Sequence, residues 1–196
     1  MLNRLPLFVV FATMTLGLAA CGASPKPAEE EPKAEAPKAA PVEGPYYDLT
    51  KETLTSKSDW TSRNIMVMGM KLGDKTTDVA TKNLGSQVGE TILLADEYLT
   101  YYQKNGLALY TFKPTGKVRR MEVLQGFADK IADPKLRSLV ANGDLKLMRE
   151  IFGMEESSEE KPEVMGTEYA YDTRGIRFIK YKSGINGLRF SEFIKK

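Results

Sequence analysis

The 196-residue sequence contains no histidine and only one cysteine, Cys21. Histidine is the commonest general base and metal ligand in proteins, so its absence excludes serine–histidine and cysteine–histidine catalysis. A single cysteine excludes an intrachain disulfide and a zinc cluster built from cysteines. Uncharged apolar stretches are short as well, since the one at 5–18 falls below the roughly 20 residues that span a bilayer as a helix. These absences favour a non-catalytic protein without a cofactor or a metal.

A strong excess of charge of either sign is also missing. Charged residues make up 28% and apolar residues 42% of the sequence, which is ordinary for a globular protein. The formal net charge of +2 supplies no large basic field for a polyanion. We therefore expect no nucleic-acid partner.

The amino terminus has the pattern of an export signal. Arg4 precedes the apolar stretch 5–18, and small residues follow it, as in a secretory signal peptide. The sequence LAAC at 18–21 resembles the lipobox of bacterial lipoproteins. That resemblance implies cleavage before Cys21 and attachment of acyl chains to its sulfur and its new amine, and several acyl chains anchor a protein stably. We predict a lipoprotein signal peptide at 1–20 and lipidation of Cys21; the alternative is a simple signal peptide with an incidental cysteine.

Gly22 follows the predicted lipidation site. In proteobacteria an aspartate at this place often keeps a lipoprotein in the inner membrane. A glycine here resembles the pattern of lipoproteins that are sorted to the outer membrane. We expect a lipid anchor in the outer membrane, with the protein facing the periplasm. In a source with one membrane, the same anchor would hold the protein on the outer face of the plasma membrane.

A segment of biased composition follows the signal peptide. Between 22 and 45 the sequence has six prolines, five glutamates and three lysines, and Val42 is its only large aliphatic residue. Such a segment cannot bury enough apolar surface to offset the entropy cost of ordering. Its prolines favour extended polyproline II, which would reach at most roughly 75 Å at about 3.1 Å per residue. We interpret 21–45 as the lipidated cysteine and a disordered tether.

The sequence beyond the tether shows two halves with the same order of signals. LGDKTTDVATKNLG at 72–85 and VANGDLKLMREIFG at 140–153 have helical spacing of apolar residues. Asp74 and Asp144 are candidate N-caps, because their carboxylates can accept from the free amides of a first helical turn. A further short helix is predicted to begin at Pro134, where the missing N–H is harmless.

Strand and turn signals follow the helices in both halves. NG at 105–106 lies between two strand-like segments, and TRG at 173–175 takes the same place in the second half. We predict an α+β fold of two tandem helix–helix–antiparallel-sheet units with three strands each. The first repeat is assigned to 46–126 and the second to 127–196. Helices or the second unit would cover the sheet of each unit.

The short glycine-based motifs of the first half resemble a known family. They are LG at 84–85, Y-x(3)-GL beginning at Tyr102, and GKV at 116–118. Over 66–124 and 131–193 the pattern is similar to the SmpA/OmlA family of outer-membrane assembly lipoproteins, and the tandem arrangement resembles the β-lactamase inhibitory protein family. The resemblance implies a fold rather than a function. The disulfides of the inhibitor cannot form in this chain, and no functional residue is carried over from either family.

A cluster of basic residues marks 174–196, which has seven lysines and arginines against Glu192. Such a surface could contact anionic lipid, lipopolysaccharide phosphate or an acidic partner. Alternatively, Arg177 and Lys182 line a sheet face and pair with the acidic segment at 155–168. Tyrosines on the strands are expected to pack the sheet, and those on a solvent face are candidate binding anchors. The candidate partner-binding residues are Arg174, Arg177, Lys180, Lys182, Arg189, Tyr171 and Tyr181.

The acidic segment at 155–168 contains six glutamates and one lysine. A calcium site needs oxygen ligands around a tight turn, usually with aspartate and glycine at set positions, and this segment lacks that pattern. We interpret it as a solvated loop rather than as a calcium site or an acidic docking loop.

The lipobox, the tether, the family resemblance and the missing catalytic groups favour a non-catalytic envelope lipoprotein. It would present a periplasmic protein-interaction domain, as a scaffold or assembly factor of an outer-membrane complex, and its partners would be the membrane and an envelope protein. The alternative is a binder of an envelope ligand or an inhibitor of an exported enzyme, which the basic strands and tyrosines motivate. An enzyme is the hypothesis with the least support.

The predicted anchor can be tested by changing its attachment point. Cys21→Ala should abolish incorporation of labelled fatty acid and move the protein from the membrane fraction to the soluble fraction, because the sulfur that carries the lipid is gone. Metabolic labelling and membrane fractionation measure both effects. Unchanged labelling in the variant would rule out Cys21 as the lipidation site.

Overall fold

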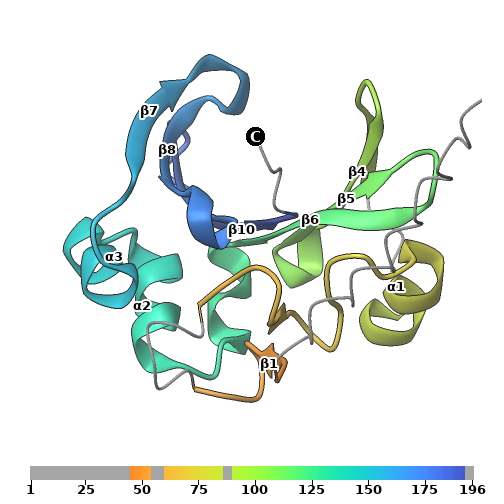
Figure 1. The fold of residues 1–196 in the computed structure, drawn as a ribbon, viewed down its shortest axis with the longest axis horizontal. Coiled ribbons are helices and arrows are strands. Elements are labelled where there is room, and N and C mark those ends of the chain that lie inside the picture. Colours follow the sequence, from red (N-terminus) through yellow and green to blue (C-terminus); the bar gives the residue numbers. More distant parts are fainter. Residues whose placement is uncertain (1–44, 54–59, 86–89, 193–196) are drawn as a thin grey trace, which may run out of the picture. The chain divides into compact units, whose positions relative to one another are not determined.

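A computed structural model of the protein describes residues 45–53, 60–85 and 90–192. The predicted signal peptide, Cys21 and the tether up to residue 44 lie outside this part. Its main element is one eight-stranded sheet in the order β3-β4-β5-β6-β10-β9-β8-β7 (Figure 1). The strands are β3 (Glu90–Leu93), β4 (Glu97–Tyr102), β5 (Leu107–Phe112), β6 (Lys117–Leu124), β7 (Ser157–Lys161), β8 (Gly166–Tyr171), β9 (Ile176–Tyr181) and β10 (Asn186–Ser191).

Three α-helices and a two-stranded ribbon accompany the sheet. The ribbon is parallel and lies at the beginning of the described chain. The remaining elements are β1 (Tyr47–Asp48), β2 (Ile65–Met66), α1 (Thr76–Leu84), α2 (Pro134–Asn142) and α3 (Leu145–Phe152), with short 3₁₀ turns η2 (Gln103–Asn105), η3 (Gln125–Lys130), η4 (Pro162–Val164) and η5 (Asp172–Arg174).

The strand order is symmetric about its central pair. Strands β3 to β6 belong to the first half of the folded chain and β7 to β10 to the second. Strands β6 and β10 pair antiparallel in the middle, where Glu122 lies opposite Arg189. The two halves are therefore joined through backbone hydrogen bonds, and β3 and β7 form the outer edges.

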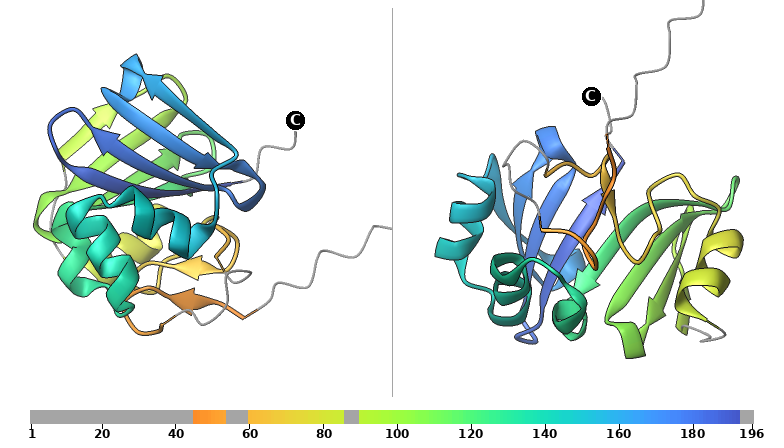
Figure 2. Two further views of the ribbon diagram at one scale, coloured as in Figure 1. Left: turned by 90° about the vertical axis from the view of Figure 1, so that its left-hand side faces the viewer. Right: turned by 90° about the horizontal axis from the view of Figure 1, so that it is seen from below.

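The eight-stranded sheet is curved. Figure 1 shows β6 and β10 in the middle, while the β4–β5 and β7–β8 ends bend toward the same side. Helices α2 and α3 lie on the opposite side, close to the strands of the second half, and α1 lies near the strands of the first half (Figure 2). We call the side that faces away from α2 and α3 the concave face.

Local capping explains where the two helices of the second half begin. The Asp144 carboxylate accepts from the backbone N–H of Lys146 at 2.8 Å, and the Asp133 carboxylate accepts from that of Leu136 at 2.9 Å. The predicted helix starts at Asp144 and Pro134 are thus confirmed. The predicted cap at Asp74 is wrong, because α1 has Lys75 at its N-cap position.

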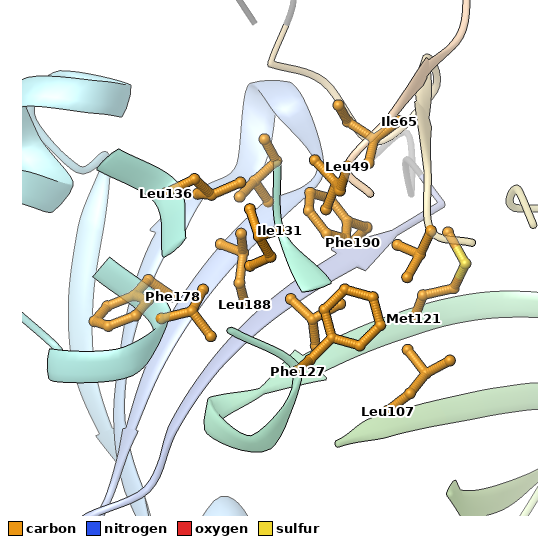
Figure 3. Close-up of a cluster of buried hydrophobic side chains, with 14 of the residues drawn as sticks. Leu49, Ile65, Leu107, Met121, Phe127, Ile131, Leu136, Phe178, Leu188 and Phe190 are labelled. Atoms are coloured by element: carbon orange, nitrogen blue, oxygen red, sulfur yellow. The ribbon is translucent and has the colours of Figure 1, made fainter. Parts of the chain in front are cut away.

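A single apolar core lies between the helices and the sheet. Figure 3 shows Ile131 and Leu136 close to Phe178 and Leu188, and all four side chains are fully buried. Burying an aliphatic or aromatic side chain of this size contributes about 1.5–3 kcal/mol. The same cluster reaches Leu107 and other residues of the first half, so both halves share one core.

The predicted fold of two helix–helix–sheet units is wrong. The strands form one continuous sheet, and each half contributes four strands instead of three. Within the described residues the first half has one α-helix, α1, where two were expected. Two separate sheets would have left β6 and β10 as additional unpaired edges, and their pairing removes both.

The segment at 155–168 is not a loop as predicted, although most of its side chains are exposed. Ser157–Lys161 forms the edge strand β7, which pairs antiparallel with β8. Its side chains are mostly exposed and none is a large apolar one, so backbone pairing rather than apolar burial makes it a strand. An alternation of apolar and polar residues, the usual strand signal, is therefore missing.

Candidate functional site

The two faces of the sheet differ in chemistry. In β10, Leu188 and Phe190 lie in the apolar core, so Arg189 between them points to the concave face. Glu122 lies next to Arg189 across the β6–β10 pair and points the same way. The sheet therefore buries apolar side chains against the helices and places charged ones on the concave face.

Three buried charged residues form the centre of this face. Arg189 Nε donates to Glu122 Oε2 at 2.9 Å, and Arg189 Nη1 donates to Glu168 Oε1 at 2.8 Å. The exposed fractions of Arg189, Glu122 and Glu168 are 4%, 1% and 5%. We call these three residues the central cluster. It links β6, β10 and β8, because the Arg189 side chain reaches across β9.

Two tyrosine hydroxyls lie against the central cluster. The Tyr181 hydroxyl donates to Glu122 Oε1, and the Tyr110 hydroxyl lies 3.5 Å from Glu122 Oε2. Gly187 leaves the space that this arrangement needs. A Cβ atom at Gly187 would lie 2.3 Å from Glu122 Oε1 and 3.2 Å from a ring carbon of Tyr181. The absence of a side chain there lets the tyrosine ring reach the carboxylate.

Less buried ion pairs flank the central cluster. Arg120 donates to Glu97 on one side. On the other side, Arg177 Nη1 donates to Glu168 Oε2 at 3.2 Å and its Nη2 donates to Asp172 Oδ1 at 3.0 Å. The side chains of Arg120 and Arg177 remain 33% and 39% exposed. Both guanidinium groups are therefore held by carboxylates and still reach the surface.

Arginines of the first half also stack on aromatic rings. The guanidinium carbon of Arg120 lies 4.3 Å from the ring centre of Tyr110, and that of Arg119 lies 4.2 Å from the ring centre of Phe112. Arg119 Nη1 is 3.3 Å from Asp96 Oδ2 as well. Each stacking contact contributes about 0.5–1 kcal/mol at an exposed site. Ring and carboxylate together limit the rotamers of these arginines.

Burial and neighbouring charges shift the pKa of Arg189 in opposite directions. Loss of water alone would lower the pKa of the Arg189 guanidinium, but Glu122 and the nearby tyrosines outweigh that effect and raise its pKa above the ordinary value. Burial, and then the Glu122 charge, raises the pKa of the Tyr181 hydroxyl and of the Tyr110 hydroxyl. At neutral pH the arginine is charged and the hydroxyls are neutral donors.

This arrangement suits recognition better than proton transfer. Glu122 accepts from Arg189 and Tyr181, and Glu168 accepts from Arg189 and Arg177. A general acid or base must reach the proton that it transfers, whereas these carboxylates are buried and engaged by protein donors. The groups of the face that reach solvent include Arg120 and Arg177, whereas the Tyr110 ring under Arg120 is buried.

The structure brings together three of the seven predicted partner-binding residues. Arg177, Arg189 and Tyr181 meet on the concave face through the carboxylates described above. Arg189 is nevertheless buried, so a partner would not contact it directly. It holds Glu122 and Glu168 in place beneath the exposed residues. The prediction of partner binding by these residues stays a prediction.

The other predicted residues lie elsewhere. Tyr171 is buried in the core, where its hydroxyl donates to the Gly153 carbonyl at 2.9 Å and burial raises its pKa to about 12. Lys180 shares the helix-covered face with core residues of β9. Arg174 ends the turn η5. Lys182 pairs with Glu160 of the acidic segment, and Arg177 pairs with Glu168 of that segment, which agrees with the alternative interpretation of the basic cluster.

Sequence reasoning missed the acidic half of the site. Glu122 and Glu168 were not among the candidates, nor were the stacking residues Arg120 and Tyr110. One local signal existed for Glu122, which stands between Met121 and Val123 in RRMEVL. A charged residue inside an apolar strand segment indicates a side chain that needs a buried partner.

Comparisons with known proteins do not assign a family. No family model matches the sequence, and no curated protein matches it. Among solved structures, a DUF4309 family protein (YjgB) from Bacillus subtilis is similar at 12% identity and a TM-score of 0.42, over 73% of this chain and 96% of that one. Likeness at this level carries no argument about function.

Two absences concern only the part of the chain that the structure describes. In that part, no helix has the length and apolar character needed to cross a membrane. The same residues contain no group of three or more acidic, cysteine or histidine side chains placed to hold a metal ion.

Removing the central cation should destabilise the fold strongly. Arg189→Met leaves the Glu122 carboxylate buried without its cation and leaves Glu168 with Arg177 alone, so we expect the free energy of unfolding to fall by about 3–5 kcal/mol. Arg177→Met, at a half-exposed position, should cost less than about 1 kcal/mol. Urea unfolding of both variants measures the difference. Adding Glu122→Gln to Arg189→Met should recover part of the loss, and equal losses for the two single variants would contradict a central role of Arg189.

The Tyr181 hydroxyl should make stability fall at high pH. The folded state holds this proton more tightly than the unfolded state, where the pKa of tyrosine is about 10. Its contribution is complete below pH 10 and is lost as the pH rises above 10, by up to about 1.4 kcal/mol per pH unit. Tyr181→Phe should therefore show a shallower decline in unfolding free energy between pH 10 and pH 11.5. Parallel declines in the variant and the wild type would exclude this linkage.

Proposed function

We propose that the protein is a non-catalytic envelope lipoprotein whose folded domain recognises a protein partner through the concave face. Its role would be that of a scaffold or assembly factor in an outer-membrane complex. The lipid on Cys21 and the tether at 21–45 would hold the domain near the membrane.

The observation that carries this proposal is the set of partly exposed arginines around the central cluster. Arg119 and Arg120 lie over Phe112 and Tyr110, and both also contact carboxylates. Arginine is enriched among the residues that dominate binding energy in protein interfaces. Because these side chains are held before a partner arrives, binding loses less of the roughly 0.5–1.5 kcal/mol that ordering each side chain costs.

The pairing of charges favours a protein partner over a phosphate-bearing ligand. Arg120 is engaged by Glu97, and Arg177 is engaged by Glu168 and Asp172. A lipopolysaccharide phosphate would have to compete with these carboxylates for the same guanidinium groups. A protein surface offers donors and acceptors together and can match a face that carries both signs of charge.

The predicted anchor would strengthen such an interaction without adding contacts. An extended tether of roughly 75 Å confines the domain to a layer next to the membrane. Confinement raises the effective concentration of the domain toward partners in the same membrane. A modest interface on the concave face would then suffice for stable association in the envelope.

The proposal predicts that contacts with a partner map to the concave face. A photo-crosslinking residue in place of Leu99, which lies beside Tyr110 on this face, should capture one defined envelope protein. The same residue in place of the exposed Lys135 on α2 should not capture it. The double variant Arg120→Ala/Arg177→Ala should reduce the crosslinked yield at least about tenfold, equivalent to about 1.4 kcal/mol.

Lys135→Ala provides the matched control, because it also removes one exposed cation and should leave the yield unchanged. Crosslinks that arise equally from Lys135 and Leu99, or a yield insensitive to the two arginines, would contradict recognition through this face. Quantitative mass spectrometry of the crosslinked species measures both.

A further inference from the structure

The two outer edges of the sheet have opposite chemistry. Strand β7 at one edge reads Ser-Ser-Glu-Glu-Lys, with charged side chains on both faces, a composition that discourages pairing with another strand. Strand β3 at the other edge reads Glu-Thr-Ile-Leu, and all four of its residues are exposed. Within the described residues, β3 pairs with β4 alone. One edge is therefore protected and the other is open.

Apolar side chains gather at the open edge. Ile92, Leu93 and Tyr98 are 48%, 69% and 42% exposed, and they are three of the six exposed large apolar side chains among the described residues. Ile92 lies opposite Leu99 on the concave face, and Leu93 lies opposite Tyr98 on the other face. The edge thus offers apolar contacts on both faces, together with backbone N–H and C=O groups that no other described strand pairs with.

We propose that β3 binds an extended strand of a partner protein, which adds antiparallel to the edge of the sheet. Backbone hydrogen bonds would supply affinity, and side-chain contacts on alternating faces would supply specificity. Read from its amino end, the added strand meets Leu93, Ile92, Thr91 and Glu90 in turn. The matching sequence is two large apolar residues, then threonine or serine, then lysine or arginine, because cross-strand neighbours of opposite charge stabilise a sheet.

Charge selects this occupant over a second copy of the chain. The only charged residue of β3 is Glu90, and the strand contains no lysine or arginine. When two copies of β3 pair with each other, the Glu90 carboxylate never meets a cation within the strand. In the antiparallel register that overlaps all four residues of two copies, Glu90 lies opposite Leu93 of the other copy, whereas a lysine or arginine in a partner strand supplies the missing cation.

The test uses the peptide acetyl-Ser-Val-Ile-Thr-Lys-Ser-amide and the purified full chain in detergent micelles. Fluorescence anisotropy of the labelled peptide should show saturable binding, and hydrogen exchange at 90–93 should slow when the peptide is bound. A peptide N-methylated at alternate amides should bind at least tenfold more weakly, because it keeps the side chains but loses backbone donors. Replacing its lysine by glutamate should weaken binding at least threefold.

Two matched variants locate the binding to one edge. Ile92→Lys introduces a charge on β3 and should weaken peptide binding at least tenfold, while Ser158→Lys on β7 should leave it unchanged. Thermal unfolding confirms that both variants fold. Arg120→Ala/Arg177→Ala should not affect the peptide, so failure of the concave-face proposal and failure of this one are distinguishable.

Three outcomes would overturn the proposal. The first is the absence of saturable binding up to 2 mM peptide, and the second is equal affinity of the N-methylated peptide. The third is self-association of the full chain that Ile92→Lys abolishes while the peptide does not bind, since this would assign the edge to a second copy.

Discussion

The buried guanidinium of Arg189 is the constraint on which the arrangement of the sheet depends. A charge removed from water must find partners of opposite sign, and Arg189 finds them in Glu122 of β6 and Glu168 of β8. A slip of one residue in the β6–β10 register would turn Arg189 toward the apolar core and Phe190 or Leu188 toward the concave face. The ion pairs and the apolar core therefore specify the same register from opposite faces of one strand.

Features that depend on neighbouring residues could be predicted from the sequence. The helix starts at Asp144 and Pro134 follow from caps within three residues, and the NG turn at 105–106 joins β4 to β5. The continuous sheet could not be predicted in the same way. The repeated motifs indicate the elements within each half, but they contain no information on which strands of the two halves pair. The central cluster could not be predicted for a similar reason, because Glu122 and Arg189 are 67 positions apart in the sequence. A group of basic residues in a sequence does not show which acidic residues it will pair with.

The two faces and the two edges of the sheet differ in the side chains that they carry. The face under α2 and α3 holds the apolar core, and the concave face holds paired charges with arginines and aromatic rings around them. The edges differ just as much, with a charged β7 and an apolar β3. Proposed recognition by the concave face and by the β3 edge would leave the helices free to serve stability alone.

The pairing of β6 with β10 joins strands that are far apart in the sequence. Hairpins within β3–β6 and within β7–β10 join strands that are close in sequence, and such local contacts form early. The contact that unites them spans 67 positions and uses the last strand of the described chain. Until β10 arrives, β6 is an edge that carries a glutamate without its arginine. The pair that neutralises the most buried charges of the sheet is therefore also the one that closes the longest connection between neighbouring strands.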